Sequence, residues 1–233
     1  MLVLIPTVMG QTQDPRSNTG VELTGTVALF RANSSVREKD CSKVVIWIST
    51  LDPGRSIRAS EPRPVYRMAQ HNKMFEPDLL VVPIGSLVDF PNLDPWFHNV
   101  FSLYRGKRFD LGLYEAGSHR EVRFDRPGAS YVFCNIHPQM SAVVLAVDSE
   151  FSGISNRAGR ITIDGVPPGR YELHAWYEYA KPESLEASTR TIVVSSGNRS
   201  FPLVVVNVTE EKSKKHDNKY GHEYDPSDAV PSY

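Results

Sequence analysis

The stretch Cys134-Asn135-Ile136-His137-Pro138-Gln139-Met140 restricts the folds open to this chain, because it places a thiol, an imidazole and a thioether with two residues between each. A tight loop with this C-x2-H-x2-M spacing can turn three side chains towards a single metal ion. A further ligand must come from elsewhere, and Phe97-His98-Asn99-Val100 supplies the candidate. A thiolate, two imidazoles and a weak axial thioether are the ligand set of a blue-copper site. We therefore expect one type 1 copper ion, held by His98, Cys134, His137 and Met140.

A structural zinc site, or an unrelated placement of the four residues, is the alternative interpretation. Zinc prefers four Cys, His or carboxylate ligands, and the loop offers no fourth ligand of this kind. A thiolate with two neutral imidazoles binds copper in both oxidation states, and a long axial thioether keeps Cu(II) from its preferred tetragonal geometry. Small ligand movements between the two states favour fast electron transfer, so the pattern favours copper.

Length and composition bound the architecture. The chain has 233 residues, enough for one large or two small domains, and 40% of them are hydrophobic, as in an ordinary globular core. A formal net charge of −1 gives no reason to expect nucleic acid or an acidic membrane surface as a partner. The 17 prolines and 15 glycines are spread between short apolar runs, which favours an all-β fold.

Apolar runs at regular spacing predict a series of strands, separated by turns rich in proline and glycine. Several short antiparallel strands of this kind pack best as β-sandwiches. The predicted strands lie at 21–30, 43–49, 66–70, 75–82, 86–90, 99–104, 120–124, 131–133, 141–147, 160–171 (strand, turn, strand), 190–194 and 201–208.

The run from Phe75 to Val100, with its His98-Asn99-Val100 end, resembles the strands that lead to the first copper ligand in the cupredoxin family. The short Cys134–Met140 loop is similar to that of amicyanin in particular. The region also resembles cupredoxin-like proteins of the methylamine-utilization type. The resemblance covers residues 62–149 and implies a cupredoxin Greek-key β-sandwich for that domain.

The resemblance also implies roles for individual residues. His98, Cys134 and His137 match the equatorial ligands, and Met140 matches the weak axial ligand. Asn99 matches the residue that ties the two ligand loops together and forms a hydrogen bond near the thiolate.

A second sandwich is expected around the first. The turn Gly165–Tyr171 and its two strands resemble carboxypeptidase-regulatory-like, prealbumin-type β-sandwiches. The segment 150–209 is short for a complete sandwich, so we expect it to join with residues 20–61 in one discontinuous domain. It carries no catalytic constellation, which is typical of a binding or spacing module.

The two ends of the chain are expected to lie outside both domains. The apolar residues 2–10 are too few for a bilayer span of ~20 residues and resemble the end of a secretory signal, so 1–19 are interpreted as a signal remnant or leader. A disordered apolar leader is the alternative. We expect no transmembrane segment and a periplasmic or otherwise exported location. Residues 210–233 have few aliphatic side chains, which predicts a disordered tail.

The two cysteines, Cys41 and Cys134, could form one disulfide in an exported protein. That pairing would consume the thiol on which the ligand loop depends. We therefore expect Cys41 to be a separate, partly buried thiol at the start of a strand.

These observations favour a one-electron carrier between redox partner proteins, with no enzymatic chemistry of its own. The alternatives are a copper-binding protein that delivers the metal, and the copper subunit of a larger redox enzyme. Because His137 lies in a loop, it is expected nearest the surface, where partners would dock. Its neighbours Trp96, Phe97 and Pro138 are either an apolar docking surface or anchors of the loop.

Overall fold

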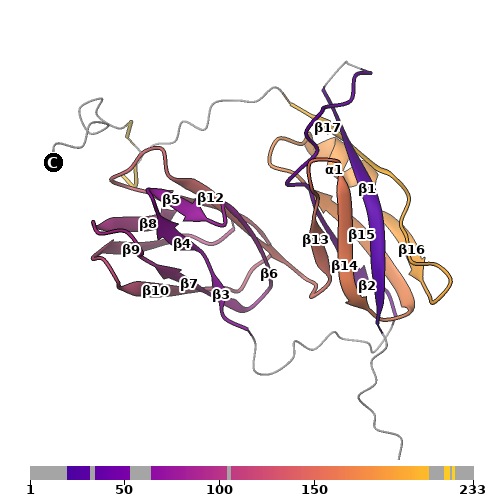
Figure 1. Cartoon of the computed structure of the whole chain (residues 1–233), viewed down its shortest axis with the longest axis horizontal. Coiled ribbons are helices and arrows are strands. Elements are labelled where there is room, and N and C mark those ends of the chain that lie inside the picture. The colour runs from indigo at the N-terminus through magenta and orange to yellow at the C-terminus, as the bar shows by residue number, and fades with distance from the viewer. Residues whose placement is uncertain are drawn as a thin grey trace, which may run out of the picture.

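The structure is a computed structural model. It describes residues 20–31, 35–52, 64–103, 106–209, 218–220 and 222–223. Strands dominate these residues and the only helix among them is short, so the predicted all-β fold class is confirmed (Figure 1). That helix is neither long nor apolar enough to cross a membrane. The expected leader at 1–19 and most of the expected tail at 210–233 lie outside the described residues.

One group of strands, which we call the flanking sandwich, is built from both halves of the chain. Its elements are β1 (Val21–Arg31), β2 (Val45–Thr50), β13 (Ser152–Ile154), β14 (Arg160–Val166), β15 (Gly169–Trp176), α1 (Pro182–Ser188), β16 (Arg190–Val194) and β17 (Val204–Val208). They form one sheet in the order β14-β1-β17 and another in the order β13-β2-β15-β16. Side chains from both sheets share one hydrophobic core, so the two sheets pack face to face.

The amino-terminal strands pair with strands from the other end of the chain. β1 runs antiparallel to β14 and parallel to β17, while β2 runs antiparallel to β13 and β15. Among the described residues, neither β1 nor β2 pairs with a strand of the segment between them and β13. From these pairings we propose that residues 20–61 and 150–209 form one domain, interrupted by a second domain at 62–149.

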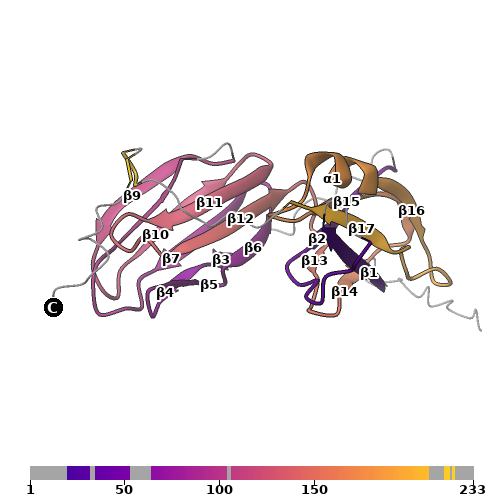
Figure 2. The ribbon, with the colours of Figure 1, turned by 90° about the horizontal axis from the view of Figure 1, so that it is seen from above.

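The other group, the central sandwich, comes from the uninterrupted middle of the chain. Its strands are β3 (Tyr66–Arg67), β4 (Ala69–His71), β5 (Met74–Glu76), β6 (Leu79–Pro83), β7 (Ser86–Pro91), β8 (His98–Ser102), β9 (Phe109–Tyr114), β10 (His119–Phe124), β11 (Gly128–Cys134) and β12 (Ser141–Val147). One sheet has the order β10-β7-β3 and the other β6-β12-β11-β8-β9, with β4 and β5 as a separate hairpin. Figure 2 shows the two sandwiches side by side along the chain's long axis.

The register of β8 against β11 places the two ligand segments next to each other. Cys134 lies opposite Val100 and Phe133 lies opposite Phe101 in this antiparallel pair. Alternate residues of a strand face the same side of a sheet, so His98 shares its face with Val100. Val100 and Cys134 both belong to the core of the central sandwich. The candidate ligands therefore start from the inner face of the five-stranded sheet.

A third hydrophobic cluster joins the two sandwiches. The alternate residues of β12 that face away from the central core pack with Val45 of β2, and Trp47 and Trp176 pack against this cluster. The β12 residues concerned are Val143, Leu145 and Val147. At its polar margin, Trp47 Nε1 donates a hydrogen bond of 3.0 Å to Asp148 Oδ1. The two buried faces of β2 and β12 explain why both strands are apolar over most of their length.

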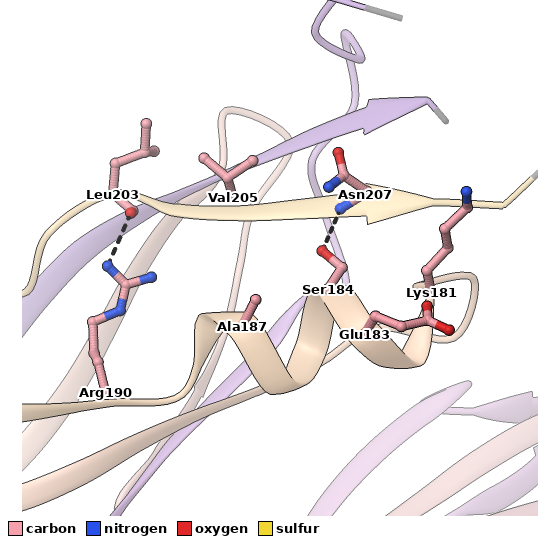
Figure 3. Close-up of a pocket in the computed structure, with 8 residues that line it drawn as sticks. All are labelled: Lys181, Glu183, Ser184, Ala187, Arg190, Leu203, Val205 and Asn207. Atoms are coloured by element: carbon pink, nitrogen blue, oxygen red, sulfur yellow. Dashed lines mark hydrogen bonds between the residues drawn. The ribbon is translucent and has the colours of Figure 1, made fainter. Parts of the chain in front are cut away.

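Helix α1 covers the outer edge of β17, which is an edge strand of its sheet. The sequence pattern did not predict this helix. Figure 3 shows α1 beside this strand, with Lys181 and Arg190 at opposite ends of the pocket between them. The pocket has a volume of about 420 Å³. The Asn207 N–H donates to Ser184 Oγ at 2.7 Å, and the Lys181 N–H donates to the Asn207 carbonyl at 3.0 Å. These contacts occupy edge groups that would otherwise be open to strand pairing with another chain.

Replacing Ser184 with Ala should lower the free energy of unfolding by about 1–2 kcal/mol, because the Asn207 N–H loses its acceptor at a largely buried position. Denaturant unfolding of the variant measures this loss. Ser196→Ala, at an exposed position of the same sandwich, is the matched control. Equal stability of both variants would contradict the role given to Ser184.

Candidate metal centre

Three side chains converge at the loop end of the central sandwich. The His98 Nδ1 and His137 Nδ1 atoms each lie 3.6 Å from Cys134 Sγ, and 3.1 Å from each other. His98 and Cys134 are both 0% exposed and His137 is 6% exposed. Among the described residues, these three form the one group of His, Cys and acidic side chains able to hold a metal ion.

The spacing of the three atoms suits a single ion. Metal–ligand bonds of about 2.0 Å for imidazole nitrogen and 2.3 Å for thiolate sulfur place a nitrogen and a sulfur about 3.7 Å apart in a trigonal arrangement. The same bonds place two nitrogens about 3.5 Å apart. The observed separations of 3.6, 3.6 and 3.1 Å are within a few tenths of an ångström of these values. The residues present therefore fit a trigonal Cys-His-His centre.

Backbone hydrogen bonds hold the ligand loop closed. The Met140 N–H donates to the His137 carbonyl at 2.9 Å, and the Cys134 N–H donates to the Met140 carbonyl at 3.3 Å. The Asn135 N–H reaches the neighbouring strand and donates to the Asn99 carbonyl at 3.2 Å. Both ends of the loop are thus fixed relative to β8, which carries His98.

Asp94 holds the outer side of the His98 ring. Its Oδ2 atom lies 2.9 Å from His98 Nε2, and the two side chains are 3% and 0% exposed. A proton on Nε2, shared with this carboxylate, leaves the lone pair of Nδ1 directed at the cysteine. The carboxylate also accepts the backbone N–H groups of Asn72 at 2.6 Å and Lys73 at 2.9 Å. Burial raises the pKa of Asp94, but these donors and His98 outweigh it, so the pKa lies below its ordinary value.

The sequence prediction missed Asp94, because the segment Pro91–Pro95 has the composition of a plain turn. Its neighbour Asn92 organises that turn: Asn92 Oδ1 accepts the Asp94 N–H at 3.0 Å, and Asn92 Nδ2 donates to the Trp96 carbonyl at 2.7 Å. An acidic residue shortly before a candidate ligand histidine was the available signal. The sequence alone does not show this contact, because it forms only when the turn places the Asp94 carboxylate beside the His98 imidazole.

Asn99 joins the two ligand segments through its backbone. Its carbonyl accepts the Asn135 N–H, whereas its side-chain amide points to β9 and donates to Asp110 Oδ1 at 2.6 Å and to the Gly112 carbonyl at 2.9 Å. The Asn99 backbone N–H is also directed at the Cys134 thiol. The expected link between the loops therefore has a structural basis in the main chain.

The protein environment acts on the protons of all three groups. Burial raises the pKa of the Cys134 thiol, against the opposing effect of hydrogen bonds from the backbone amides of Asn99, Ile136 and His137. Burial lowers the pKa of His98, and Asp94 only partly compensates. Burial, with the charges of His98 and Lys73, lowers the pKa of His137 to about 4. Both imidazoles are therefore neutral near pH 7, the form in which they bind metals.

Two further residues complete the comparison with the sequence prediction. Met140 is 1% exposed and packs in the same hydrophobic cluster as Cys134, which keeps it a candidate for the axial ligand. Cys41 forms no disulfide and is 1% exposed in the core of the flanking sandwich. It precedes the turn at residues 42–43 that leads into β2, rather than starting the strand, and it is fully rather than partly buried.

Exposed apolar side chains lie close in sequence to the candidate ligands. Phe97 is 51% exposed, Leu93 53% and Ile136 38%, whereas Trp96 is partly buried beneath the Lys73 ammonium group. His137 is the most exposed of the four expected ligands, as predicted, although its 6% exposure leaves it buried. Of the two aromatic neighbours, Phe97 thus belongs to the surface and Trp96 to the loop.

No protein-family model and no curated protein matches this chain. Solved structures match parts of it. The Cu-containing nitrite reductase (NirK) from Thermus scotoductus SA-01 is 20% identical with a TM-score of 0.36, over 37% of this chain and 23% of the reductase. The chain thus spans less than a quarter of that protein's length.

Two smaller proteins match over most of their own length. The purple cupredoxin from Nitrosopumilus maritimus is 22% identical with a TM-score of 0.32, over 35% of this chain and 99% of that one. An oxidized mutant of amicyanin is 18% identical with a TM-score of 0.35, over 45% and 99%. At such TM-scores the likenesses are partial, and the function of this chain has to follow from its own site.

The metal-free protein should lose stability as the pH falls from 7 to 5. The unfolded imidazole of His137 takes up a proton near pH 6.5, while the folded one does so only near pH 4, so the unfolded state binds more protons over this interval. His137 alone contributes a loss of about 2 kcal/mol, and His98 acts in the same direction. Denaturant unfolding at both pH values measures it. In His137→Gln the pH dependence should be smaller, and an unchanged dependence would contradict the assignment.

Proposed function

We propose that this chain is a type 1 copper protein that carries single electrons between redox partners. The observation that carries the proposal is the buried triangle of His98 Nδ1, His137 Nδ1 and Cys134 Sγ at trigonal spacing. Met140 is the proposed axial ligand, since it closes the same loop and lies in the same buried cluster. When bound, copper supplies the reversible Cu(I)/Cu(II) couple.

The donor set favours copper over structural zinc. Asp94, the carboxylate hydrogen-bonded at this site, contacts the far nitrogen of the His98 ring and so lies behind the imidazole rather than beside the cysteine sulfur. The described residues therefore present two nitrogens and one sulfur, with no fourth hard ligand. Structural zinc sites are closed by four such ligands, whereas blue-copper sites are trigonal with a weak axial contact.

The protein frame limits movement of the ligands. His98 is held through its backbone by β8 and through its ring by Asp94, and Cys134 ends a strand paired directly with β8. The loop that carries His137 is tied at both ends by main-chain hydrogen bonds. Ligands fixed in this way cannot relax towards different geometries in the two oxidation states, which keeps the reorganisation energy of electron transfer small.

The surface around His137 suits partner proteins that dock transiently. Leu93, Phe97 and Ile136, which are close in sequence to the proposed ligands, expose apolar area, whereas His137 itself is buried. We propose that redox partners contact this surface and exchange electrons through the His137 edge, in an exported compartment. Burial of all three donor atoms disfavours the alternative of metal delivery, because a buried ion leaves slowly.

Titration of the metal-free protein with Cu(II), followed by visible absorption and electron paramagnetic resonance, tests the proposal. An intense blue band with narrow copper hyperfine splitting, at one copper per chain and bleached by ascorbate, is the expected result. Repeated oxidation and reduction without loss of copper would distinguish an electron carrier from a delivery protein. An ordinary Cu(II) spectrum would overturn the proposed ligand set.

Replacing Cys134 with Ser should abolish the intense absorption band, because the band arises from charge transfer between the thiolate and Cu(II). Cys41→Ser is the matched control and should keep the band, since Cys41 lies in the other hydrophobic core. Visible absorption of both copper-loaded variants measures the difference. Loss of colour in Cys41→Ser would reverse the assignment of the two cysteines.

Replacing Met140 with Leu should raise the reduction potential while the protein retains copper. The axial thioether donates weakly to the oxidised ion, and its removal therefore disfavours Cu(II) relative to Cu(I). Leucine fills a similar volume at this buried position, so the fold should tolerate the change. Cyclic voltammetry measures the shift. An unchanged potential would show that Met140 is not the axial ligand.

A further inference from the structure

A short segment near the carboxyl terminus contacts the ligand loop. The Lys219 N–H donates to Asn135 Oδ1 at 2.9 Å, and the Lys219 ammonium group contacts Asp110 Oδ2 at 3.0 Å. In Figure 2 this segment lies beside β9, which carries Asp110. Asn135 directly follows Cys134, so the contact lies one residue from the proposed copper thiolate. The sequence analysis predicted a disordered tail at 210–233, whereas Lys219 within it makes these defined contacts.

The segment has local order of its own. Asn218 Oδ1 accepts the backbone N–H of Tyr220 at 2.9 Å and that of His222 at 3.2 Å. The Asn218 N–H donates to the His222 carbonyl at 2.7 Å. These bonds form a compact turn that presents Lys219 to the central sandwich, with its side chain only 22% exposed.

Asp110 connects Lys219 to the proposed copper ligands. Its other oxygen, Oδ1, accepts the Asn99 side-chain amide, and the Asn99 backbone in turn contacts both Asn135 and the Cys134 thiol. A positive charge on Lys219 therefore lies at the end of a short series of contacts that leads through Asp110 and Asn99 to the Cys134 thiol. The hydrogen bond to Asp110 raises the pKa of Lys219, so the ammonium group stays charged at neutral pH.

We propose that Lys219 is a positioning residue that fastens the carboxy-terminal segment across the ligand loop and raises the reduction potential of the site. This inference rests on the proposed copper function. Electron uptake lowers the net positive charge of the centre, and a neighbouring cation favours that change. Without Lys219, the Asp110 carboxylate would be left uncompensated beside Asn99 and would stabilise the oxidised state.

The Asp110 side chain is 42% exposed, and an ion pair at such a position ordinarily contributes little. The number of bonds made by the two residues distinguishes this pair. The Lys219 backbone contacts Asn135 in the ligand loop, and its side chain contacts Asp110 in β9. Lys219 therefore links the ligand loop to β9. Both oxygens of Asp110 are occupied, one by Lys219 and one by Asn99 and Gly112. The position of the charge is therefore defined by several bonds.

The test compares reduction potentials of the copper-loaded wild type with Lys219→Met, Asp110→Asn and the double variant. Lys219→Met should lower the equilibrium constant for reduction about fivefold, a shift of about 40 mV for one electron. Asp110→Asn keeps an acceptor for Asn99 and should raise the potential. The double variant should return close to wild type, and Lys219→Arg should retain the wild-type value.

Lys107→Met is the matched control. Lys107 forms an ion pair with Asp125 at 2.9 Å, and Asp125 directly follows Phe124, the last residue of β10. The opposite end of β10, at His119, pairs with Pro91 next to the turn that carries Asp94. Lys107 therefore belongs to a lysine ion pair at the other end of this strand from the site. Its removal should leave the potential unchanged. An equal shift in Lys107→Met, or a blue Lys219→Met protein with wild-type potential, would overturn the proposed tuning by Lys219.

Hydrogen exchange of the metal-free protein tests the fastening independently of copper. Backbone amides of residues 135–137, 139 and 140 should exchange severalfold faster in Lys219→Met than in wild type, and at the wild-type rate in Lys107→Met. Unchanged exchange would overturn the fastening role. Wild-type protein that binds copper without a blue band would instead contradict the proposed function, so the two failures are distinguishable.

Discussion

The site depends on the register of β8 against β11. Cys134 pairs with Val100, and His98 lies two residues before Val100 on the same strand. Cys134 and His98 therefore lie on the same inner face of one sheet. A slip of one residue would turn one of the two ligand strands over and point its donor away from the other. Core residues such as Val100 and Val132 lie on that same face and oppose such a slip, because it would expose them. Core packing and ligand placement are thus one constraint.

Burial of the candidate ligands away from solvent is the second constraint on this centre. Burial disfavours the charged forms of His98 and His137, so the metal-free site already contains neutral imidazoles, with one ring oriented by Asp94. The thiol is the remaining group that must lose a proton when a metal binds; burial raises its pKa, and the backbone amides directed at the sulfur offset only part of that rise. The fold therefore holds both imidazoles in the neutral form that binds metals. The consequence is a lower free energy of unfolding at acidic pH, where the unfolded histidines take up protons.

Sequence reasoning recovered the elements whose signal is local and missed those defined by contacts across the fold. The C-x2-H-x2-M loop and the alternating apolar strands were visible, and the structure brings His98, Cys134 and His137 together. Strand β9 and helix α1 were not predicted: β9 is partly exposed and contains Gly112, and α1 spans only seven residues. Asp94 and Lys219 have ordinary neighbours in sequence. Their roles arise from a turn and a chain end that return to the site, which no local pattern encodes.

The flanking sandwich determines which surfaces of the central sandwich remain open. It covers the outer face of β12 and β6 through the cluster around Leu145 and Trp47, with the Trp47–Asp148 hydrogen bond at its margin. β12 begins directly after the ligand loop and leads at its other end into the flanking sandwich. We propose that partners dock at the loop end, where Phe97 and Ile136 are exposed and where the Lys219 segment also lies. On this proposal, the docking surface and the charge of Lys219 act at the same end of the central sandwich.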